Sequence, residues 1–281
     1  MKILVANPNT SASVTDKLVA SGRLVASAGT ELIPMTAPRG VPYIATRAEA
    51  AIGSAVFLEM LAERRGTIDA AVCAAFGDPG LGGARELFDF PVVGMAEAAM
   101  LVACTLGRSF SIVSFSKSLE PWFAEIVAWH GLSGRCASIR MLDGGFKSID
   151  DVQSEKEELL VELANRTVKQ DAADVVILAG APLAGLANKI ADKVPVPLVD
   201  GIQAAVTMAE GLVRMKPRKA TSGTFQRPGP KDSKGLGQAL AEGGGGGQVA
   251  RHHLVDRGVR RGGGHQAAAG GDVVDVVAGG R

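Results

Sequence analysis

Polar residues that could bind an anion follow the first predicted strand of the chain. Residues 2–6 (KILVA) form an unbroken apolar run, typical of a buried strand, and Asn7, Asn9 and Thr10 come directly after it. A helix is expected over residues 12–26, and side-chain amides and hydroxyls can cap its first backbone N–H groups. The same N–H groups and the helix dipole attract anions. Two roles therefore stay open for these residues, helix capping and the binding of an anionic ligand.

Two turns of small residues follow two other predicted strands, one after Ala75 and one after Gly180. Because ligands of open parallel sheets sit outside the carboxyl ends of the strands, a site between two such sheets would be flanked by these turns. Neither alanine nor glycine has a side chain that can transfer a proton. Asp78 is the only carboxylate in either turn, and a general base at this position would need a pKa raised by burial. Capping of the turn or of the next helix is the competing role for Asp78.

Other groups at the same strand ends are candidates for ligand binding. Ser114 and Ser116 lie at the end of the strand predicted over residues 110–115. Free N–H groups in the turns could hold an oxyanion, and Gly180 would let a ligand approach the backbone closely. The predicted ligand-binding residues are Asn7, Asn9, Thr10, Ala75, Phe76, Gly77, Ser114, Ser116, Gly180 and Ala181.

The two turns belong to a unit that occurs twice, at residues 69–94 and 174–201. Each copy opens with an Asp and runs through a short apolar strand, a small-residue turn and a helix pattern into a Val-rich strand that begins with Pro. When the two opening aspartates are aligned, Ala75 falls opposite Gly180. A repeated unit of this kind predicts two similar lobes with a site between them.

The order of the predicted elements gives an α/β fold built from two parallel-sheet lobes. Residues 1–96 plus 205–225 are expected to form the first lobe and residues 97–204 the second, with a last helix that returns to the first lobe. The predicted strands are 2–6, 31–35, 69–75, 91–95, 110–115 and 135–142, with two more in the second copy of the repeat. The predicted helices are 12–26, 48–65, 82–87, 97–106, 119–130, 149–170 and 204–215.

Composition argues against several classes of protein. The 281 residues are 47% hydrophobic, enough for a buried core, and the net charge of +1 comes without a basic domain, so nucleic-acid binding has little support. The chain has no apolar run of membrane-spanning length and no signal peptide, which predicts a cytoplasmic protein that does not enter membranes. Cys73, Cys104 and Cys136 show no metal-binding spacing and are expected to be reduced, buried thiols.

The character of the sequence changes after residue 215. Residues 243–281 consist almost entirely of Gly, Ala, Arg, Val, Asp, His and Gln and have no amphipathic period. Residues 226–281 are therefore expected to be a disordered or frameshifted tail. Our hypothesis is that the natural protein ends near Ala241, and a clean open reading frame through residue 281 on resequencing the gene would remove it.

Four segments in the right order resemble a known family. MKILVANPNTS at residues 1–11, AAFGDPGL at 74–81, ILAGAPLAGLA at 177–187 and PVPLVDG at 195–201 look like the hydantoin and allantoin racemases of the aspartate/glutamate racemase superfamily. The resemblance covers about residues 1–223. It implies a two-lobed α/β protein with pseudo-twofold symmetry, an active site in the cleft between the lobes, and no cofactor.

The resemblance also implies a mechanism with two bases. Inversion of a carbon acid next to a carbonyl removes a proton on one face and returns one on the other. In this family a cysteine at the end of each repeated strand does this, and the two cysteines would fall at Ala75 and Gly180, so both are replaced here. Cys73 points to the same side of its strand as Ala75 but lies about 7 Å deeper, so it cannot simply take that place.

The leading prediction is a cofactor-independent isomerase that acts on a small ureide or amino acid derivative by proton abstraction next to a carbonyl, with a base other than cysteine. Two alternatives stay open. One is a decarboxylase or lyase that uses the same enolate-stabilising cleft, and the other is a binding protein that kept the cleft without the chemistry. The expected partner is a small-molecule substrate, and a homo-oligomer is left open.

Overall fold

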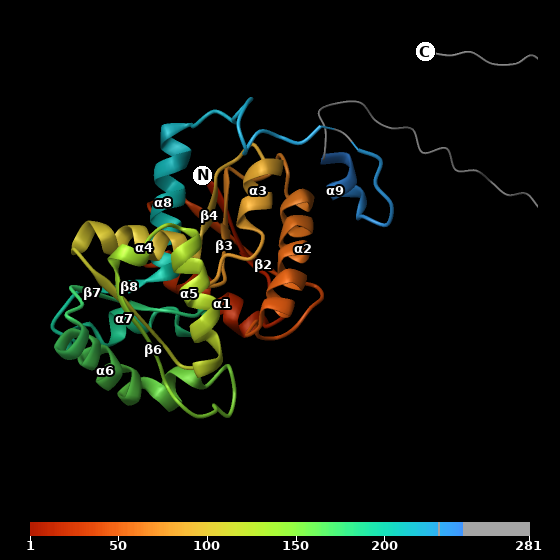
Figure 1. The fold of residues 1–281 in the computed structure, drawn as a ribbon. Helices are drawn as coiled ribbons and strands as arrows, with labels where there is room; N and C mark the ends of the chain where they lie inside the picture. The colour runs from red at the N-terminus through yellow and green to blue at the C-terminus, as the bar shows by residue number, and fades with distance from the viewer. Residues whose placement is uncertain (230, 244–281) are drawn as a thin grey trace, which may run out of the picture. The chain divides into compact units, whose positions relative to one another are not determined.

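The computed structural model describes residues 1–229 and 231–243 of the chain (Figure 1). These residues form two four-stranded sheets in which every neighbouring pair of strands is parallel. The strand order is β2-β1-β3-β4 in the first sheet and β6-β5-β7-β8 in the second. Because the two orders are equivalent, both sheets have the same topology, and the predicted pair of similar α/β lobes is confirmed.

The elements follow the predicted order up to residue 215, with ends that differ by a few residues. The first sheet contains β1 (Lys2–Asn7), β2 (Glu31–Thr36), β3 (Ala70–Cys73) and β4 (Val92–Gly94). The second contains β5 (Phe110–Ser114), β6 (Cys136–Met141), β7 (Val175–Leu178) and β8 (Leu198–Asp200). The helices are α1 (Ala12–Arg23), α2 (Arg47–Glu63), α3 (Leu81–Leu87), α4 (Met95–Leu106), α5 (Glu120–Trp129), α6 (Val152–Asp171), α7 (Leu186–Lys189), α8 (Gly201–Met215) and α9 (Gln238–Gly243).

Each copy of the repeat begins with an aspartate that binds the main chain at the start of its lobe. Asp69 Oδ2 accepts a hydrogen bond of 2.7 Å from the backbone N–H of Lys2. Asp174 Oδ2 accepts bonds of 2.9 and 3.0 Å from the backbone N–H groups of Arg108 and Ser109. The two carboxylates thus fasten β3 beside β1 and β7 beside β5. The aspartates that the alignment pairs therefore make equivalent contacts in the two lobes.

The helix predicted in the second copy is realised only in part. A short 3₁₀ turn (Ala181–Leu183) and the four-residue helix α7 replace the seven-residue α3 of the first copy. Pro182 has no backbone N–H to donate, and Gly185 has φ +87, which places a left-handed residue before α7. Together these residues break the helix pattern.

Helices α4 and α8 join the two lobes through one apolar core. They pack against each other, α8 also contacts α1 and β3 of the first lobe, and α4 contacts β7 of the second (Figure 1). A single cluster of buried side chains includes Ile3 and Val72 from the first sheet and Ile112 and Ile177 from the second. Helix α8, the last helix predicted from the sequence, thus packs on elements of the first sheet's side.

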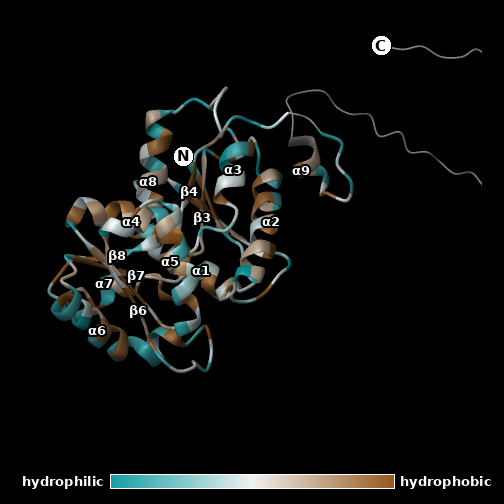
Figure 2. Cartoon of the chain, in the orientation of Figure 1, coloured by the Kyte–Doolittle hydropathy of each residue, from teal (hydrophilic) through white to brown (hydrophobic). Residues whose placement is uncertain are grey.

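The longest helix, α6, is amphipathic. Leu160 and Ala164 pack into the apolar cluster of the second lobe, while hydrophilic residues lie along its outer turns (Figure 2). The pattern of Glu and Lys residues at 155–158 predicts a solvated face, but only Glu158 is exposed, since Glu155 and Lys156 pair with each other and Glu157 pairs with Lys189 and Lys193. Within the part of the chain that the structure describes, no helix is long and apolar enough to cross a membrane.

Helix α9 lies in the segment for which no ordered structure was expected. Ala239 and Leu240 are half-buried and pack against the apolar cluster of α2 and the first sheet. The proposed end of the natural chain near Ala241 stays a prediction, since residues 244–281 lie outside the described residues. The lobe boundaries also stay a prediction.

Buried aspartates cap the two helices at the lobe interface. Asp78 accepts hydrogen bonds of 2.9 and 2.8 Å from the backbone N–H groups of Ala96 and Glu97 in α4. Asp200 accepts bonds of 3.0 and 3.2 Å from the first N–H groups of α8. Asp200 stands directly before its helix, but Asp78 reaches α4 from the turn after β3. Each of these two helices therefore starts with an aspartate cap. In the first copy of the repeat the aspartate lies in the turn after the strand, and in the second copy it lies near the end of the unit.

Gly94 leaves the space that the Asp78 carboxylate occupies. A Cβ at residue 94 would lie 2.4 Å from the carboxyl carbon of Asp78. We expect Gly94→Ala to lower the free energy of unfolding by about 2–4 kcal/mol, because it combines overpacking with the loss of a helix cap. Urea denaturation followed by circular dichroism measures this. In the matched control Gly134→Ala, where a Cβ meets no atom within 4 Å, the change should stay below about 0.5 kcal/mol. Equal stabilities of the two variants would contradict the packing argument.

Glu210 fastens α8 to the loop before β2. It is 3% exposed, and its carboxylate accepts hydrogen bonds from the backbone N–H and the hydroxyl of Ser27, from the Thr30 hydroxyl and from Arg214. Burial by itself raises the pKa of Glu210, but these hydrogen bonds outweigh burial and hold the pKa at about 2.

A folded-state pKa below that of the unfolded chain, about 4.3, adds stability above that value, and the stability is lost as the pH falls toward 2. We therefore expect the free energy of unfolding to fall between about pH 5 and pH 2. Glu210→Gln should lower stability at pH 7 by about 2 kcal/mol and reduce the fall at acid pH. Urea denaturation at a series of pH values tests this, and an equal acid-induced fall in both proteins would count against the role of Glu210.

Candidate functional site

The turns after β3 and β7 meet at one cavity between the lobes. Ala75 and Gly180 both line it, as the alignment of the repeat predicted, and its volume is about 20 Å³. A space of this size holds about one water molecule, so a larger ligand requires the surrounding side chains to move. The interlobe cavity is lined by Asn9, Tyr43, Ile44, Ala75, Phe76, Leu119, Trp122, Phe123, Gly180, Ala181 and Pro182.

The structure brings five of the ten predicted ligand-binding residues to this cavity, namely Asn9, Ala75, Phe76, Gly180 and Ala181. The other five lie around it. Their contacts with a ligand stay a prediction, and the bonds that they make within the protein indicate what each does in the fold.

Asn7 and Asn9 form one hydrogen-bonded unit at the end of β1. Asn7 is fully buried, and its Nδ2 donates to Asn9 Oδ1 at 2.9 Å and to Thr15 Oγ1 at 3.0 Å. Asn9 Oδ1 also accepts from the backbone N–H of Ser11 at 2.9 Å, and Ser11 caps α1. The amide orientation of Asn9 is thereby fixed, with its Nδ2 left without an acceptor among the described residues. Asn9 can donate into the cavity while Asn7 supports it from behind.

Thr10, Ser114 and Ser116 do not line the cavity. The Thr10 backbone N–H donates to Val41 O at 2.9 Å, which ties the first strand end to the loop over residues 37–46. Ser114 Oγ donates to Ala179 O at 2.7 Å, so this hydroxyl joins β5 to the residue before Gly180. Ser116 shares a hydrogen bond with Ser118. Thr10 and Ser114 thus fasten the strand ends beside the cavity, whereas the bond of Ser116 stays within its own turn.

Gly180 has a backbone conformation that disfavours a side chain. Its φ is +115, and a Cβ at this position would lie 3.0 Å from Cε1 of Phe115. A non-glycine residue with this conformation costs roughly 1–3 kcal/mol of strain. A side chain at the second strand end would therefore strain the backbone and press on the Phe115 ring.

Asp78 lies beside the cavity lining but is directed toward α4. It follows the turn that starts at Ala75, has φ +49, and both of its carboxylate oxygens accept the α4 backbone N–H groups. Of the two roles predicted for Asp78, these bonds favour capping, although the helix that it caps is α4 and not the one directly after Pro79. The catalytic role stays a prediction.

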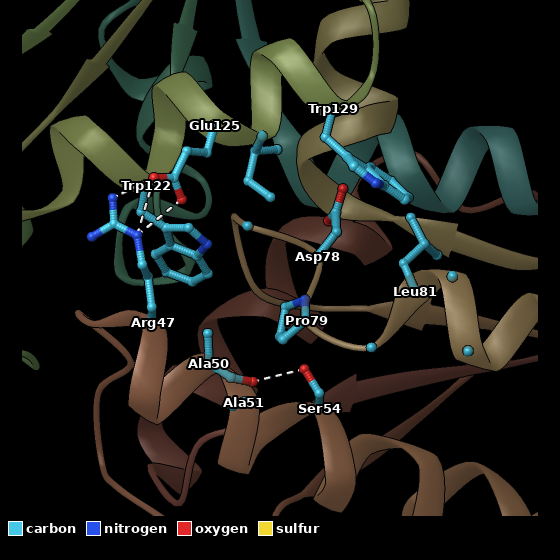
Figure 3. Close-up of a pocket in the computed structure, with 15 residues that line it drawn as sticks. Arg47, Ala50, Ala51, Ser54, Asp78, Pro79, Leu81, Trp122, Glu125 and Trp129 are labelled. Atoms are coloured by element: carbon cyan, nitrogen blue, oxygen red, sulfur yellow. Dashed lines mark hydrogen bonds and ion pairs between the residues drawn. The ribbon is translucent and has the colours of Figure 1, made fainter.

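Asp78 also borders a larger groove on the surface, between α2, the turn over residues 77–83 and α5. This α2–α5 groove has a volume of about 460 Å³, and Figure 3 shows Asp78, Trp122 and Trp129 around it. Arg47 on α2 and Glu125 on α5 form an ion pair across it (Figure 3). Trp122 lines both the groove and the interlobe cavity, so this one side chain separates the two spaces.

Gly77, which was predicted to bind ligand, lines this groove and not the cavity. Its φ is +140, and a Cβ would lie only 2.3 Å from the Trp122 ring. The glycine allows the indole of the second lobe to lie directly on the turn of the first. Gly77 is therefore needed for the contact between the lobes.

His130 makes contacts that the sequence did not predict. It ends α5, as predicted, and the Nε2 of its buried imidazole reaches the first lobe, 3.4 Å from Asp78 Oδ2. Its Nδ1 lies 3.6 Å from Glu97 Oε1 on α4. Glu97 is paired in turn with Arg85. These partners lie far from His130 in the sequence, and no local pattern indicates them.

The thiols do not reach the cavity. Burial raises the pKa of Cys73 well above its usual value, and its Sγ lies 3.5 Å from Pro79 O. Cys104 lies on α4, and burial raises the pKa of Cys136, at the start of β6, to about 11. Among the described residues, no group of three or more His, Cys, Asp or Glu side chains is placed to hold a metal ion.

Comparisons with known proteins agree with this architecture. The Asp/Glu/hydantoin racemase family model matches residues 3–209. The hydantoin racemase of Paenarthrobacter aurescens is 33% identical over 82% of this chain and 99% of its own length. The allantoin racemase from Klebsiella pneumoniae has a TM-score of 0.81 at 34% identity and covers 85% of this chain and 98% of its own. Arylmalonate decarboxylase shares the fold, with a TM-score of 0.53 at 15% identity over 76% of this chain and 92% of its own.

The family model spans most of the chain, and the curated relative is matched over nearly its whole length. Two parallel sheets of identical strand order, with a cavity at the carboxyl ends of their strands, are the architecture that the resemblance implied. The chain belongs to the Asp/Glu/hydantoin racemase family.

Proposed function

We propose that the protein binds a small ureide or amino acid derivative in the interlobe cavity and acts on it as an isomerase by removing a proton next to a carbonyl group. The observation that carries this proposal is the meeting of Ala75 and Gly180, from equivalent turns of the two lobes, at one cavity. Identities of 33–34% to proteins named hydantoin racemase and allantoin racemase support the substrate class. The binding site then lies at the carboxyl ends of β3 and β7, where open parallel sheets take ligands.

Hydrogen-bond donors at this cavity suit an oxyanion. Asn9 Nδ2 and the backbone N–H groups of Phe76 and Gly180 donate to no described residue, and all three residues line the cavity. Removal of a proton next to a carbonyl places negative charge on the carbonyl oxygen, and preorganised donors stabilise that charge most strongly where water is excluded. The expected role of these donors is to hold the enolate.

The base is the part of the chemistry that differs from the family pattern. The cavity lining contains no thiol, carboxylate, imidazole or amine side chain. The base therefore reaches the ligand from outside this lining, with Asp78 and solvent as the two candidates, and the site lowers the barrier by stabilising the enolate. General acid and base groups each contribute about 10²- to 10⁴-fold to such reactions, so a lower rate is expected than with two thiols.

Two other functions, binding without chemistry and decarboxylation, agree with the same lining. Binding without chemistry needs no proton-transfer group, and decarboxylation through the same enolate needs one proton donor at most. The side chains of Ala75 and Gly180 agree with both possibilities. Measurement of binding and of proton exchange on the same sample separates these functions from isomerisation.

The first experiment follows solvent deuterium incorporation at C5 of enantiopure L-5-methylhydantoin, the smallest chiral member of this ligand class, by NMR together with optical rotation. The hydantoin exchanges unaided, so a blank without protein is subtracted. Exchange above the blank with the natural protein is the expected result. Ala75→Cys should raise the rate at least about 10-fold, because it restores one thiol at a strand end.

Each other outcome has its own meaning. A ligand-induced rise in the melting temperature without exchange would replace the isomerase by a binding protein. Neither exchange nor a rise would contradict the substrate class. Gly180→Cys combined with Ala75→Cys is a further comparison, but the φ of +115 at residue 180 requires its folding to be checked by circular dichroism first.

A further inference from the structure

The hydroxyl of Tyr43 is buried without a hydrogen-bond partner among the residues that the structure describes. A polar group in this state normally destabilises the fold, since it has lost its bonds to water and gained none in return. Tyr43 is also one of two residues with a polar side-chain amide or hydroxyl in the lining of the interlobe cavity, the other being Asn9. An unpaired donor at this position suggests that its partner is a ligand.

The loop that carries Tyr43 is fixed on both sides of the residue. Val41 O accepts the backbone N–H of Thr10, and the backbone N–H groups of Ala45 and Thr46 donate to Glu49 Oε2 at 2.7 and 2.9 Å. Thr46 then caps α2. The position of the tyrosine is therefore set by the same strand end that orients Asn9 and by the start of a long helix.

The ring of Tyr43 is held by aromatic contacts with the second lobe. Its centroid lies 5.7 Å from that of Phe115 and 5.8 Å from that of Phe146. Phe115 in turn lies against Gly180, where a Cβ would be 3.0 Å from its ring. The Phe115 ring therefore lies between the Tyr43 phenol of the first lobe and Gly180 at the strand end of the second.

We propose that Tyr43 is a ligand-binding residue whose O–H donates a hydrogen bond to a carbonyl or carboxylate oxygen of the molecule in the interlobe cavity. This inference rests on the proposed function, because it assigns a donor to the same site. Tyr43 and Asn9 would then hold polar atoms of the ligand, and the apolar lining would enclose the rest.

The surroundings of Tyr43 keep its hydroxyl protonated, so that the hydroxyl can donate a hydrogen bond. Burial raises the pKa of the phenol, and the negative charge of Glu49 raises the pKa further. The hydroxyl consequently keeps its proton at neutral pH and acts as a neutral hydrogen-bond donor, not as a base. This agrees with a site that stabilises an enolate without a basic side chain.

Tyr43→Phe tests the assignment, because it keeps the ring and removes only the hydroxyl oxygen. A buried hydroxyl without a partner costs stability, so the variant should melt at a temperature roughly 2–4 °C higher than the natural protein. The same variant should bind L-5-methylhydantoin about 3- to 10-fold more weakly in a ligand-observed NMR titration, since it loses one hydrogen bond. A tyrosine with a purely structural role would not give a higher stability together with weaker binding.

Ser111→Ala is the matched control. Ser111 is fully buried on β5, outside the cavity lining, and its hydroxyl is paired with Ser138 Oγ at 2.8 Å. Removal of this hydroxyl should lower the melting temperature and leave the dissociation constant of the hydantoin unchanged. The two hydroxyl deletions are thus expected to change stability in opposite directions.

Unchanged hydantoin affinity in Tyr43→Phe, with binding by the natural protein intact, would overturn the role of Tyr43 and leave the proposed function in place. A lower melting temperature with unchanged affinity would show that the hydroxyl has a structural partner and would overturn the inference as well. If the natural protein binds no hydantoin, the proposed function fails, and the role of Tyr43 at that site fails with it.

Discussion

Helices α4 and α8 pack against each other and against both sheets, and the apolar core that they share with the strands decides where the two lobes meet. Parallel strands present all their carboxyl ends at one edge of a sheet, so the joining of two such sheets through one core brings two sets of strand ends together. The start of each joining helix is fixed by a buried aspartate, Asp78 for α4 and Asp200 for α8. The interlobe cavity follows from this arrangement.

The polar groups around the cavity fall into two kinds. Asp78, Ser114 and Asn7 have their hydrogen bonds within the protein, and each fastens a turn or strand end. The Tyr43 hydroxyl is buried without a partner among the described residues, and Asn9 Nδ2 donates to none of them. Satisfied groups contribute stability, whereas an unpaired donor is retained at a cost, and in a cleft that cost is consistent with ligand binding.

The residues at the two strand ends set what the cavity can do. Alanine at residue 75 and glycine at residue 180 leave an apolar space with donors and no proton carrier in its lining. The left-handed backbone of Gly180 and the ring of Phe115 beside it indicate that the surroundings have adapted to the glycine. The proposed chemistry accordingly depends on enolate stabilisation more than on acid and base groups.

The sequence by itself determined the two α/β lobes, the order of their elements and the pairing of Ala75 with Gly180. These features depend on apolar periodicity and on the spacing of a repeat, and both are local properties of the chain. It predicted a helix in the second copy of the repeat but not that α7 would be so short, because one proline and one left-handed glycine outweighed the helix pattern. Only the tertiary structure decided that Asp78 caps α4 and that His130 lies between the carboxylates of Asp78 and Glu97. It also decided that the Tyr43 hydroxyl is buried without a partner among the described residues. The physical reason is that the hydrogen bonding and burial of a side chain depend on residues distant in the sequence, which meet only when the two lobes pack together.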